Sequence, residues 1–285
     1  MTLIDGKSIS AKVKDEIKSA ASDLAAKGVE PALAVILVGE DAASKTYVAS
    51  KEKACAACGI RSVAHRLSSD VSEAALLELI ENLNEDESID GILVQLPLPK
   101  HIDTNKILEK ISPQKDVDGF SAINVGKLTS GLADGFVPCT PLGVMRLLEE
   151  YGVQIAGKNA VVLGRSNIVG KPMASLLLNA DATVTIAHSK TKDLKRLCAD
   201  ADILVAAVGK AYFVDADMVK QGAVVIDVGI NRGEDGKLRG DVDFDAVAPK
   251  CSFITPVPGG VGPMTIAMLL SNTIKSAKNR LRQRV

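Results

Sequence analysis

A tyrosine and a lysine lie four residues apart in the stretch TYVASKEKACAACGI, at Tyr47 and Lys51. Residues four apart on a helix share one face, so a phenol and an amine could act together there. Short-chain reductases use the same Tyr-x-x-x-Lys spacing to place a proton-donating phenol beside a lysine. A solvent-facing pair among Lys45, Glu52 and Lys53 is the plainer alternative, so the rest of the chain has to decide.

The helix that would carry this pair follows an expected strand. The apolar run ALAVILVG, residues 32–39, is typical of a buried strand, and a helix is predicted at about 42–58. Asp41 can cap the start of this helix and Gly59 can end it. The pair would therefore lie just beyond the carboxyl end of a strand, where open α/β sheets bind their ligands.

Three further stretches could bring polar side chains, or the accessible backbone of a glycine-rich loop, close to the Tyr47 and Lys51 pair. Gln95 interrupts the apolar run ILVQLP, where a buried amide would need partners. Asp116 and Asp118 flank one valine in a loop, so both could project towards a cleft. The loop PVPGGVGP, residues 256–263, leads into a helix and is typical of close backbone approach to a ligand. A capped amide, a solvated acidic turn and an ordinary loop are the alternatives.

Short apolar strands alternate with amphipathic helices along the chain, which predicts parallel α/β sheets. A second series starts at CTPLGVMRLLEEYG, where Thr140 suits an N-cap and Pro141 suits the first helical position. We therefore place a domain boundary near residue 139. One long helix is expected from Pro263 to about Arg282, and it could return to the first domain.

The segment VVLGRSNIVGKPMASLLL predicts a strand, a glycine-bearing turn and a helix, a geometry that can hold a pyrophosphate. A P-loop does not fit, because Gly164 to Gly170 is one residue too long and Pro172 offers no hydroxyl for Mg²⁺. A dinucleotide fingerprint fits except that Ser166 takes the second glycine position. Both glycines could instead only allow close strand–helix packing.

The next strand, in ATVTIAHSKT, indicates which dinucleotide would bind. It ends in Ser189 and Lys190, where NAD enzymes carry an acidic residue for the ribose diol, and Arg165 lies beside the phosphate turn. A cation and a hydroxyl in place of an acid favour a 2′-phosphate, hence NADP over NAD. Because Tyr47 lies far before Gly164 and in the other domain, the motif order argues against a short-chain reductase.

Composition excludes several other classes of function. The chain has 285 residues and a net charge of -1, which offers no electrostatic footprint for nucleic acid or an anionic membrane. No apolar run is long enough to cross a bilayer and the N-terminus lacks a signal peptide, so we expect a cytoplasmic protein. No metal site is expected, because the histidines are dispersed and the pair Cys55 and Cys58 has no second pair.

Six blocks of the sequence together resemble one enzyme family: YVASKEKACAACGI, DGILVQLPLP, PQKDVDGFSAINVGKL, PCTPLGV, GRSNIVGKPM and ITPVPGGVGPMT. The family is methylenetetrahydrofolate dehydrogenase/cyclohydrolase in its bacterial two-domain form, and the resemblance runs from about Asp5 to the last helix. It implies an α/β fold of two domains with a cleft between them. Residues 1–139, completed by the C-terminal helix at about 265–285, would bind folate, and residues 140–264 would form a Rossmann-like NADP-binding domain.

The resemblance also implies an activity and a set of site residues. The family oxidises 5,10-methylenetetrahydrofolate with NADP and hydrolyses the methenyl product to 10-formyltetrahydrofolate, in one-carbon metabolism and purine biosynthesis, as a homodimer. The implied catalytic set is Lys51, Tyr47, Gln95 and Asp118: a catalytic lysine, a ring that stacks on folate, an amide that hydrogen-bonds the lysine, and a carboxylate that holds the pterin. Folate contacts are also implied for Val94, Leu96, Pro258, Gly259, Gly260, Val261 and Gly262, and cofactor contacts for Gly164, Arg165, Ser166, Ser189 and Ile230.

The implied chemistry suits these residue types. Hydride transfer from the methylene carbon needs positioned reactants rather than a covalent catalyst, whereas hydrolysis needs proton transfers. A lysine whose pKa is lowered by burial can carry those protons, which is the role we expect for Lys51 with Gln95 orienting it. An NADP-dependent carbonyl reductase of the short-chain type and a non-catalytic folate- or nucleotide-binding relative are the alternatives.

Overall fold

The computed structural model describes residues 1–283 and divides them into two compact units. Unit 1 consists of Met1–Ala11 and Thr140–Thr265, and unit 2 consists of Lys12–Cys139 and the described residues from Ile266 onward. The sequence grouped residues 1–139 together, whereas the structure groups the first eleven with unit 1. Residues 284–285, the end of the expected C-terminal helix, lie outside the described residues.

The N-terminal residues belong to unit 1 because they extend its sheet. Strand β1 (Thr2–Leu3) pairs in parallel with β11 (Phe253–Ile254), and the backbone N–H of Asp5 donates to the Tyr151 hydroxyl at 2.7 Å. A strand of two residues has no hydrophobic period, so sequence patterning could not find it.

Unit 1 is built on a six-stranded parallel sheet with the order β1-β11-β8-β7-β5-β6. Its longer strands are β5 (Asn159–Leu163), β6 (Thr183–Ala187), β7 (Ile203–Ala206) and β8 (Val224–Asp227). A separate antiparallel hairpin consists of β9 (Asn231–Arg232) and β10 (Leu238–Arg239). Its helices are α6 (Cys139–Glu150), α7 (Gly170–Asn179), α8 (Leu194–Ala199) and α9 (Phe244–Val247), and its 3-10 turns are η1 (Ala216–Met218) and η2 (Ala248–Lys250). The first residue of α6, Cys139, is counted with unit 2. This is the predicted Rossmann-like α/β fold.

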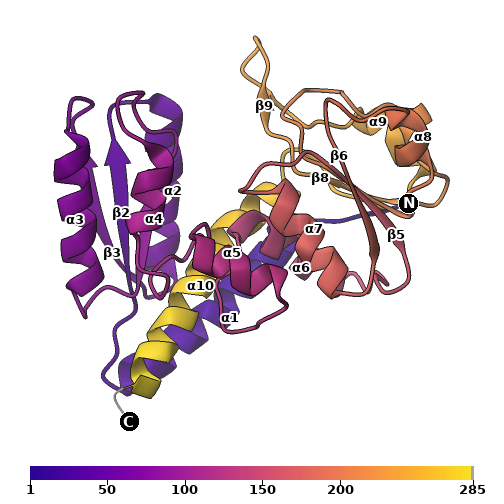
Figure 1. The fold of residues 1–285 in the computed structure, drawn as a ribbon. Coiled ribbons are helices and arrows are strands. Elements are labelled where there is room, and N and C mark those ends of the chain that lie inside the picture. The colour runs from indigo at the N-terminus through magenta and orange to yellow at the C-terminus, as the bar shows by residue number, and fades with distance from the viewer. Residues whose placement is uncertain (284–285) are drawn as a thin grey trace. The chain divides into compact units, whose positions relative to one another are not determined.

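Unit 2 is built on a three-stranded parallel sheet with the order β3-β2-β4. The strands are β2 (Ala32–Val38), β3 (Arg61–Leu67) and β4 (Gly91–Val94), and the helices are α2 (Ala42–Ala57), α3 (Glu73–Glu85), α4 (Thr104–Lys110) and α5 (Ala122–Thr129). Helix α1 (Gly6–Ala26) and helix α10 (Val261–Gln283) begin in unit 1 and continue in unit 2. All seven residues of β2 are buried, as a central strand covered on both faces requires. Figure 1 shows α3 and α2 on opposite sides of β2 and β3.

Helix α10 is tied to the sheet of unit 2 by one buried ion pair. The Arg280 guanidinium donates to both carboxylate oxygens of Asp90, at 2.7 and 3.0 Å, and the Ala32 backbone N–H donates to the same carboxylate at 2.9 Å. Asp90 is 1% exposed, so its charge has left water and depends on these partners.

Replacing Arg280→Leu should destabilise the protein strongly. The Asp90 carboxylate would stay buried without its cation, which typically lowers the free energy of unfolding by about 3–5 kcal/mol. Urea denaturation of the variant and wild type measures this loss. Arg282→Leu, at an exposed position two residues along the same helix, should change stability by less than about 0.5 kcal/mol. Equal losses in the two variants would contradict the role of the ion pair.

Candidate functional site

Helix α2 positions the tyrosine–lysine pair as the sequence predicts. It starts at Ala42, where the Asp41 carboxylate accepts the Ser44 backbone N–H at 2.7 Å, and Cys58 caps its other end. Tyr47 is 45% exposed, whereas the side chain of Lys51 is half-buried. One residue of the pair thus meets solvent and the other points into unit 2.

The Lys51 amine is held by Gln95. Lys51 Nζ donates to Gln95 Oε1 at 2.9 Å, and Gln95 Nε2 donates to the Leu96 carbonyl at 2.8 Å. The backbone N–H of Gln95 donates to the Ile36 carbonyl, so the backbone that carries this side chain is fixed to the central strand β2. The partners that a buried amide requires are therefore present, and one of them is the lysine.

The two aspartates that follow the 113–115 turn have different surroundings. The Asp116 carboxylate accepts the backbone N–H groups of Phe120 and Ser121, at 3.2 and 2.8 Å, and the Asn124 amide at 2.9 Å, so it holds its own loop together. Asp118 instead interacts electrostatically with Lys51. Of the two loop carboxylates, Asp118 is the one that the structure brings to the lysine.

Burial moves both ionisable groups of this cluster towards their neutral forms. Burial lowers the pKa of Lys51, and the negative charge of Asp118 opposes this shift only in part. Burial likewise raises the pKa of Asp118, against the opposing effect of the Lys51 charge. An amine with a lowered pKa can accept and return a proton at a pH where an exposed lysine stays charged.

Sequence reasoning missed two neighbours of this cluster, Cys139 and Asn272. Cys139 Sγ donates towards Asp118 Oδ1 at 3.4 Å, and the Asn272 amide donates to the Val117 carbonyl at 2.8 Å. Both residues are buried. The signal available in the sequence was a polar Asn within the apolar run IAMLLSNTI of the last helix, where a buried amide needs partners.

The predicted nucleotide turn connects β5 to α7 and depends on two glycines. Gly164 has a φ of 112°, and a Cβ atom there would lie 2.2 Å from the Ala207 carbonyl oxygen. A Cβ on Gly170 would lie 2.2 Å from the Gly164 carbonyl oxygen. Any side chain would clash at either position, so the close turn needs glycine at both.

Ser166 stands at the usual second glycine position, and its hydroxyl is hydrogen-bonded to the start of α7. Ser166 Oγ accepts the backbone N–H groups of Val169 and Gly170 at 3.2 and 3.4 Å, at the first turn of α7. The exposed turn thus presents a helix N-terminus, the usual place for a pyrophosphate.

Arg165 and Ser189 follow adjacent parallel strands and reach the same edge of the sheet. Leu163 of β5 is in register with Ala187 of β6, and the Gly164 N–H donates to the Ala187 carbonyl at 2.8 Å. Both Arg165 and Ser189 are exposed, as groups that meet a ligand phosphate must be. The close glycine turn at Gly164 fits a dinucleotide, and a serine instead of a carboxylate at position 189 fits one that carries a 2′-phosphate.

The loop 258–262 lies in unit 1 with the predicted cofactor residues, whereas Tyr47, Lys51, Val94, Gln95, Leu96 and Asp118 lie in unit 2. Lys7 N–H donates to the Gly259 carbonyl at 3.1 Å, and a Cβ on Gly262 would lie 3.7 Å from Ile230 Cδ1. Ile230, at 47% exposed, therefore lies against this loop. Tyr47 and the nucleotide turn lie in different units, which does not fit a short-chain reductase.

Two buried aspartates, which the sequence did not reveal, fix the loops at the carboxyl edge of the unit 1 sheet. Asp227 accepts the backbone N–H groups of Gly229, Asp241 and Val242 at 2.9 Å each. Asp241 accepts those of Val208, Gly209 and Lys210. Burial raises the pKa of Asp227 to about 6, although its three N–H donors favour the charged form.

Within residues 1–283, no group of three or more His, Cys, Asp or Glu side chains is arranged to hold a metal ion. The five cysteines are free and buried. The helices described between residues 1 and 283 include none with the length and apolar character needed to cross a bilayer.

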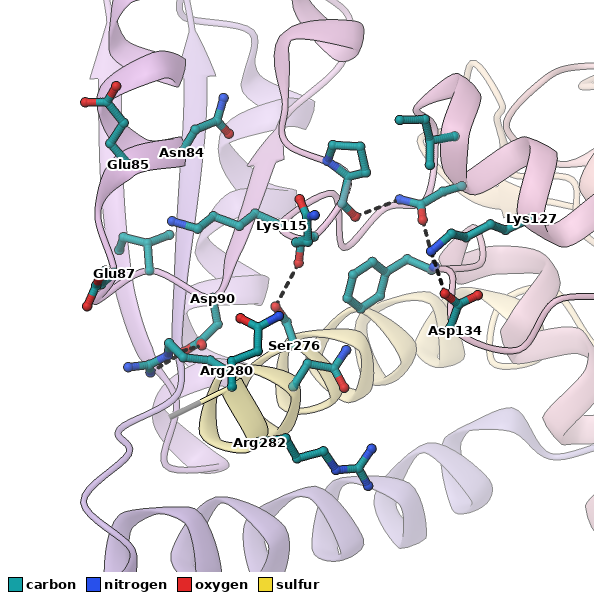
Figure 2. Close-up of a pocket in the computed structure, with 18 residues that line it drawn as sticks. Asn84, Glu85, Glu87, Asp90, Lys115, Lys127, Asp134, Ser276, Arg280 and Arg282 are labelled. Atoms are coloured by element: carbon teal, nitrogen blue, oxygen red, sulfur yellow. Dashed lines mark hydrogen bonds and ion pairs between the residues drawn. The ribbon is translucent and has the colours of Figure 1, made fainter. Parts of the chain in front are cut away.

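A cavity of about 710 Å³ in unit 2 is lined by none of the predicted site residues. Figure 2 shows Arg280 beside Asp90 and Lys127 beside Asp134, so these four charges on its wall are already paired. The Lys115 amine donates to the carbonyls of Leu83 and Asp86. Arg280, Lys127 and Lys115 on this wall are therefore engaged by partners within the protein.

Comparison with known proteins adds an independent finding. Residues 4–118 match the model of the tetrahydrofolate dehydrogenase/cyclohydrolase catalytic domain, and residues 138–281 match that of the NAD(P)-binding domain of the same name. The chain is 71% identical to the bifunctional protein FolD of Campylobacter hominis, over 99% of each chain. A crystal structure of the bifunctional enzyme FolD from Campylobacter jejuni is 59% identical, with a TM-score of 0.97 and coverage of 98% of this chain and 99% of that one. The enzyme from Trypanosoma brucei, complexed with NADP cofactor and inhibitor, is 43% identical, with a TM-score of 0.94 and coverage of 99% of each chain.

Lys51 should react with an amine-selective acylating reagent at a lower pH than an exposed lysine does. Only the neutral amine reacts, and the lowered pKa of Lys51 leaves a larger neutral fraction at any given pH. Peptide mass spectrometry after pulses of acetic anhydride between pH 6 and 10 gives the midpoint for each lysine. The exposed Lys53 on the same helix is the control, and midpoints that coincide would contradict the expectation.

Proposed function

Because the chain belongs to the tetrahydrofolate dehydrogenase/cyclohydrolase family, we propose that it is an NADP-dependent methylenetetrahydrofolate dehydrogenase and methenyltetrahydrofolate cyclohydrolase of one-carbon metabolism. It oxidises 5,10-methylenetetrahydrofolate to the methenyl form and hydrolyses that product to 10-formyltetrahydrofolate. The observation that carries the proposal is the Lys51 amine, half-buried and hydrogen-bonded to Gln95 beside Asp118.

The oxidation asks the chain for binding and orientation. NADP, when bound, accepts the hydride that leaves the methylene carbon of the folate. The folate cation that results spreads its charge over two nitrogens, so no covalent intermediate is needed. Positioning of the two reactants supplies most of the rate. We assign the cofactor contacts to Gly164, Arg165, Ser166, Ser189 and Ile230. The close turn that needs glycine at position 164, and the exposed Arg165 next to it, support this set.

The hydrolysis asks the chain for proton transfer. Water attacks the methenyl carbon and loses one proton, which leaves a neutral carbinolamine. One carbon–nitrogen bond then breaks: its nitrogen takes up a proton, and the hydroxyl proton leaves to solvent as the formyl C=O forms, so that one proton is released overall. The neutral Lys51 amine can accept the first proton and return it to the leaving nitrogen, because its lowered pKa makes both transfers accessible. Gln95 Oε1 accepts from the amine and so fixes its direction.

The remaining folate contacts follow from position and chemistry. The exposed Tyr47 ring lies one helical turn before Lys51 and offers a flat surface for stacking on a pterin. The Asp118 carboxylate can accept hydrogen bonds from the amino-pyrimidine edge. Val94 and Leu96 flank Gln95, and we assign to the loop 258–262 the backbone contacts that its glycines permit.

The finer assignments are also ours. Residues 1–139 with the C-terminal helix would form the folate-binding catalytic domain, and residues 140–264 the NADP-binding domain. We propose a cytoplasmic homodimer that binds no nucleic acid, the last point supported by the net charge of -1. Light scattering of the purified protein would test the dimer against 29.8 kDa for one chain.

Purified protein should convert 5,10-methylenetetrahydrofolate to methenyltetrahydrofolate with NADP⁺ and more slowly with NAD⁺. Arg165→Gln should raise KM for NADP⁺ about tenfold or more and leave KM for NAD⁺ nearly unchanged, because it removes a charged partner of the 2′-phosphate. Absorbance of the methenyl product measures both rates. Absence of turnover with either cofactor would refute the dehydrogenase, whereas equal KM changes would refute only the role of Arg165.

Lys51→Met should remove the cyclohydrolase activity. Losing a group that transfers protons costs about 100- to 10,000-fold in rate. The decay of methenyltetrahydrofolate, followed against an enzyme-free blank, measures hydrolysis alone. Lys53→Met, at an exposed position two residues along α2, should hydrolyse at the wild-type rate. If Lys51→Met does so as well, another group carries the protons.

A further inference from the structure

Cys139 is a buried thiol that faces the candidate folate site. It is 3% exposed, and its Sγ lies 3.4 Å from both Asp118 Oδ1 and the Val117 carbonyl oxygen. Burial holds the pKa of the thiol well above its ordinary value, so it keeps its proton. A thiol has one proton, so these two oxygens compete for a single donor.

Asn272 of α10 resolves that competition. Its side-chain nitrogen donates to the Val117 carbonyl at 2.8 Å and to the Val137 carbonyl at 3.0 Å, the two nearest acceptors for its two hydrogens, and Cys139 Sγ lies farther away at 3.8 Å. The Val117 carbonyl thus has a good donor already, and a carboxylate is a stronger acceptor than a carbonyl. The thiol proton is therefore free for Asp118.

We propose that Cys139 and Asn272 are positioning residues for Asp118, with Asn272 fixing the backbone before it and the Cys139 thiol donating to its carboxylate, so that this carboxylate is held ready to accept the pterin amino group. The inference rests on the proposed folate site. Neither residue need touch substrate: each acts through Asp118.

The charges around Asp118 set the direction of the effect. Lys51 from α2 and the thiol from α6 favour its carboxylate form, whereas burial and the charge of Asp116 from its own loop oppose it. Cys55 on α2 faces Lys51 and keeps its proton, since burial raises its pKa to about 12. Removing the thiol should therefore raise the pKa of Asp118, and folate binding that needs the carboxylate should fail at a higher pH than in wild type.

The test compares Cys139→Ala, which removes the donor, with Cys139→Ser, which keeps one. In Cys139→Ala we expect KM for 5,10-methylenetetrahydrofolate to rise about tenfold, whereas KM for NADP⁺ should stay unchanged. The pH below which folate binding weakens should be higher than in wild type. Cys139→Ser should recover most of the folate affinity. Cys58→Ala is the matched control, because that cysteine is buried in the same unit and its Sγ donates to the Lys14 carbonyl instead of to Asp118.

Two outcomes of these kinetics would overturn the inference. One is a Cys139→Ala variant that behaves like Cys58→Ala, and the other is an equal loss for folate and NADP⁺ without rescue by serine. Wild-type turnover in the same assay separates this failure from failure of the proposed function.

A spectroscopic measurement covers the case in which Cys139→Ala does not fold. The infrared S–H stretch that is missing in Cys139→Ser identifies the Cys139 band in wild type. In Asp118→Asn this band should move to higher frequency, because an amide oxygen is a weaker acceptor than a carboxylate. An unmoved band would mean that the thiol does not donate to Asp118, and the inference would fall.

Discussion

Burial of the Lys51 amine is the constraint on which the proposed chemistry of unit 2 depends. An ammonium that leaves water loses several kcal/mol of solvation, so the site must supply partners or accept a neutral amine. The structure does both: Gln95 accepts a hydrogen bond, Asp118 supplies an opposing charge, and burial still lowers the lysine pKa. The same burial raises the pKa of Asp118, so the two groups approach each other in proton affinity. Full exposure of Lys51 would remove this match.

Both units use the carboxyl edge of a parallel sheet to gather their polar residues. In unit 2 the helix carrying Lys51 follows β2, and Gln95 follows the adjacent strand β4. In unit 1 the turn at Gly164 follows β5, and Ser189 follows the adjacent strand β6. Because parallel strands end at one edge, residues distant in sequence come together without long loops.

The sequence was most informative where local pattern decides structure. Residues 32–39 predicted the buried strand, and the residues after it predicted a helix within one residue of Ala42–Ala57. The resemblance paired Lys51 with Gln95, and the two are in contact. Their catalytic roles stay predictions, because a contact does not report a rate.

What the sequence could not predict depends on tertiary contacts. Only the conformation of the loop reveals that Asp116 turns inward while Asp118 meets the lysine. Cys139 counted as one scattered cysteine until the fold brought it to Asp118. The first strand was missed because its two residues find their partner, β11, about 250 residues away.

The pairing of β1 with β11 has a practical consequence for protein engineering. A contiguous gene fragment for residues 140–265 would omit β1 and leave β11 as an open sheet edge, a template for aggregation. Isolating the nucleotide-binding unit therefore calls for a rearranged chain in which the first eleven residues are grafted back onto that edge.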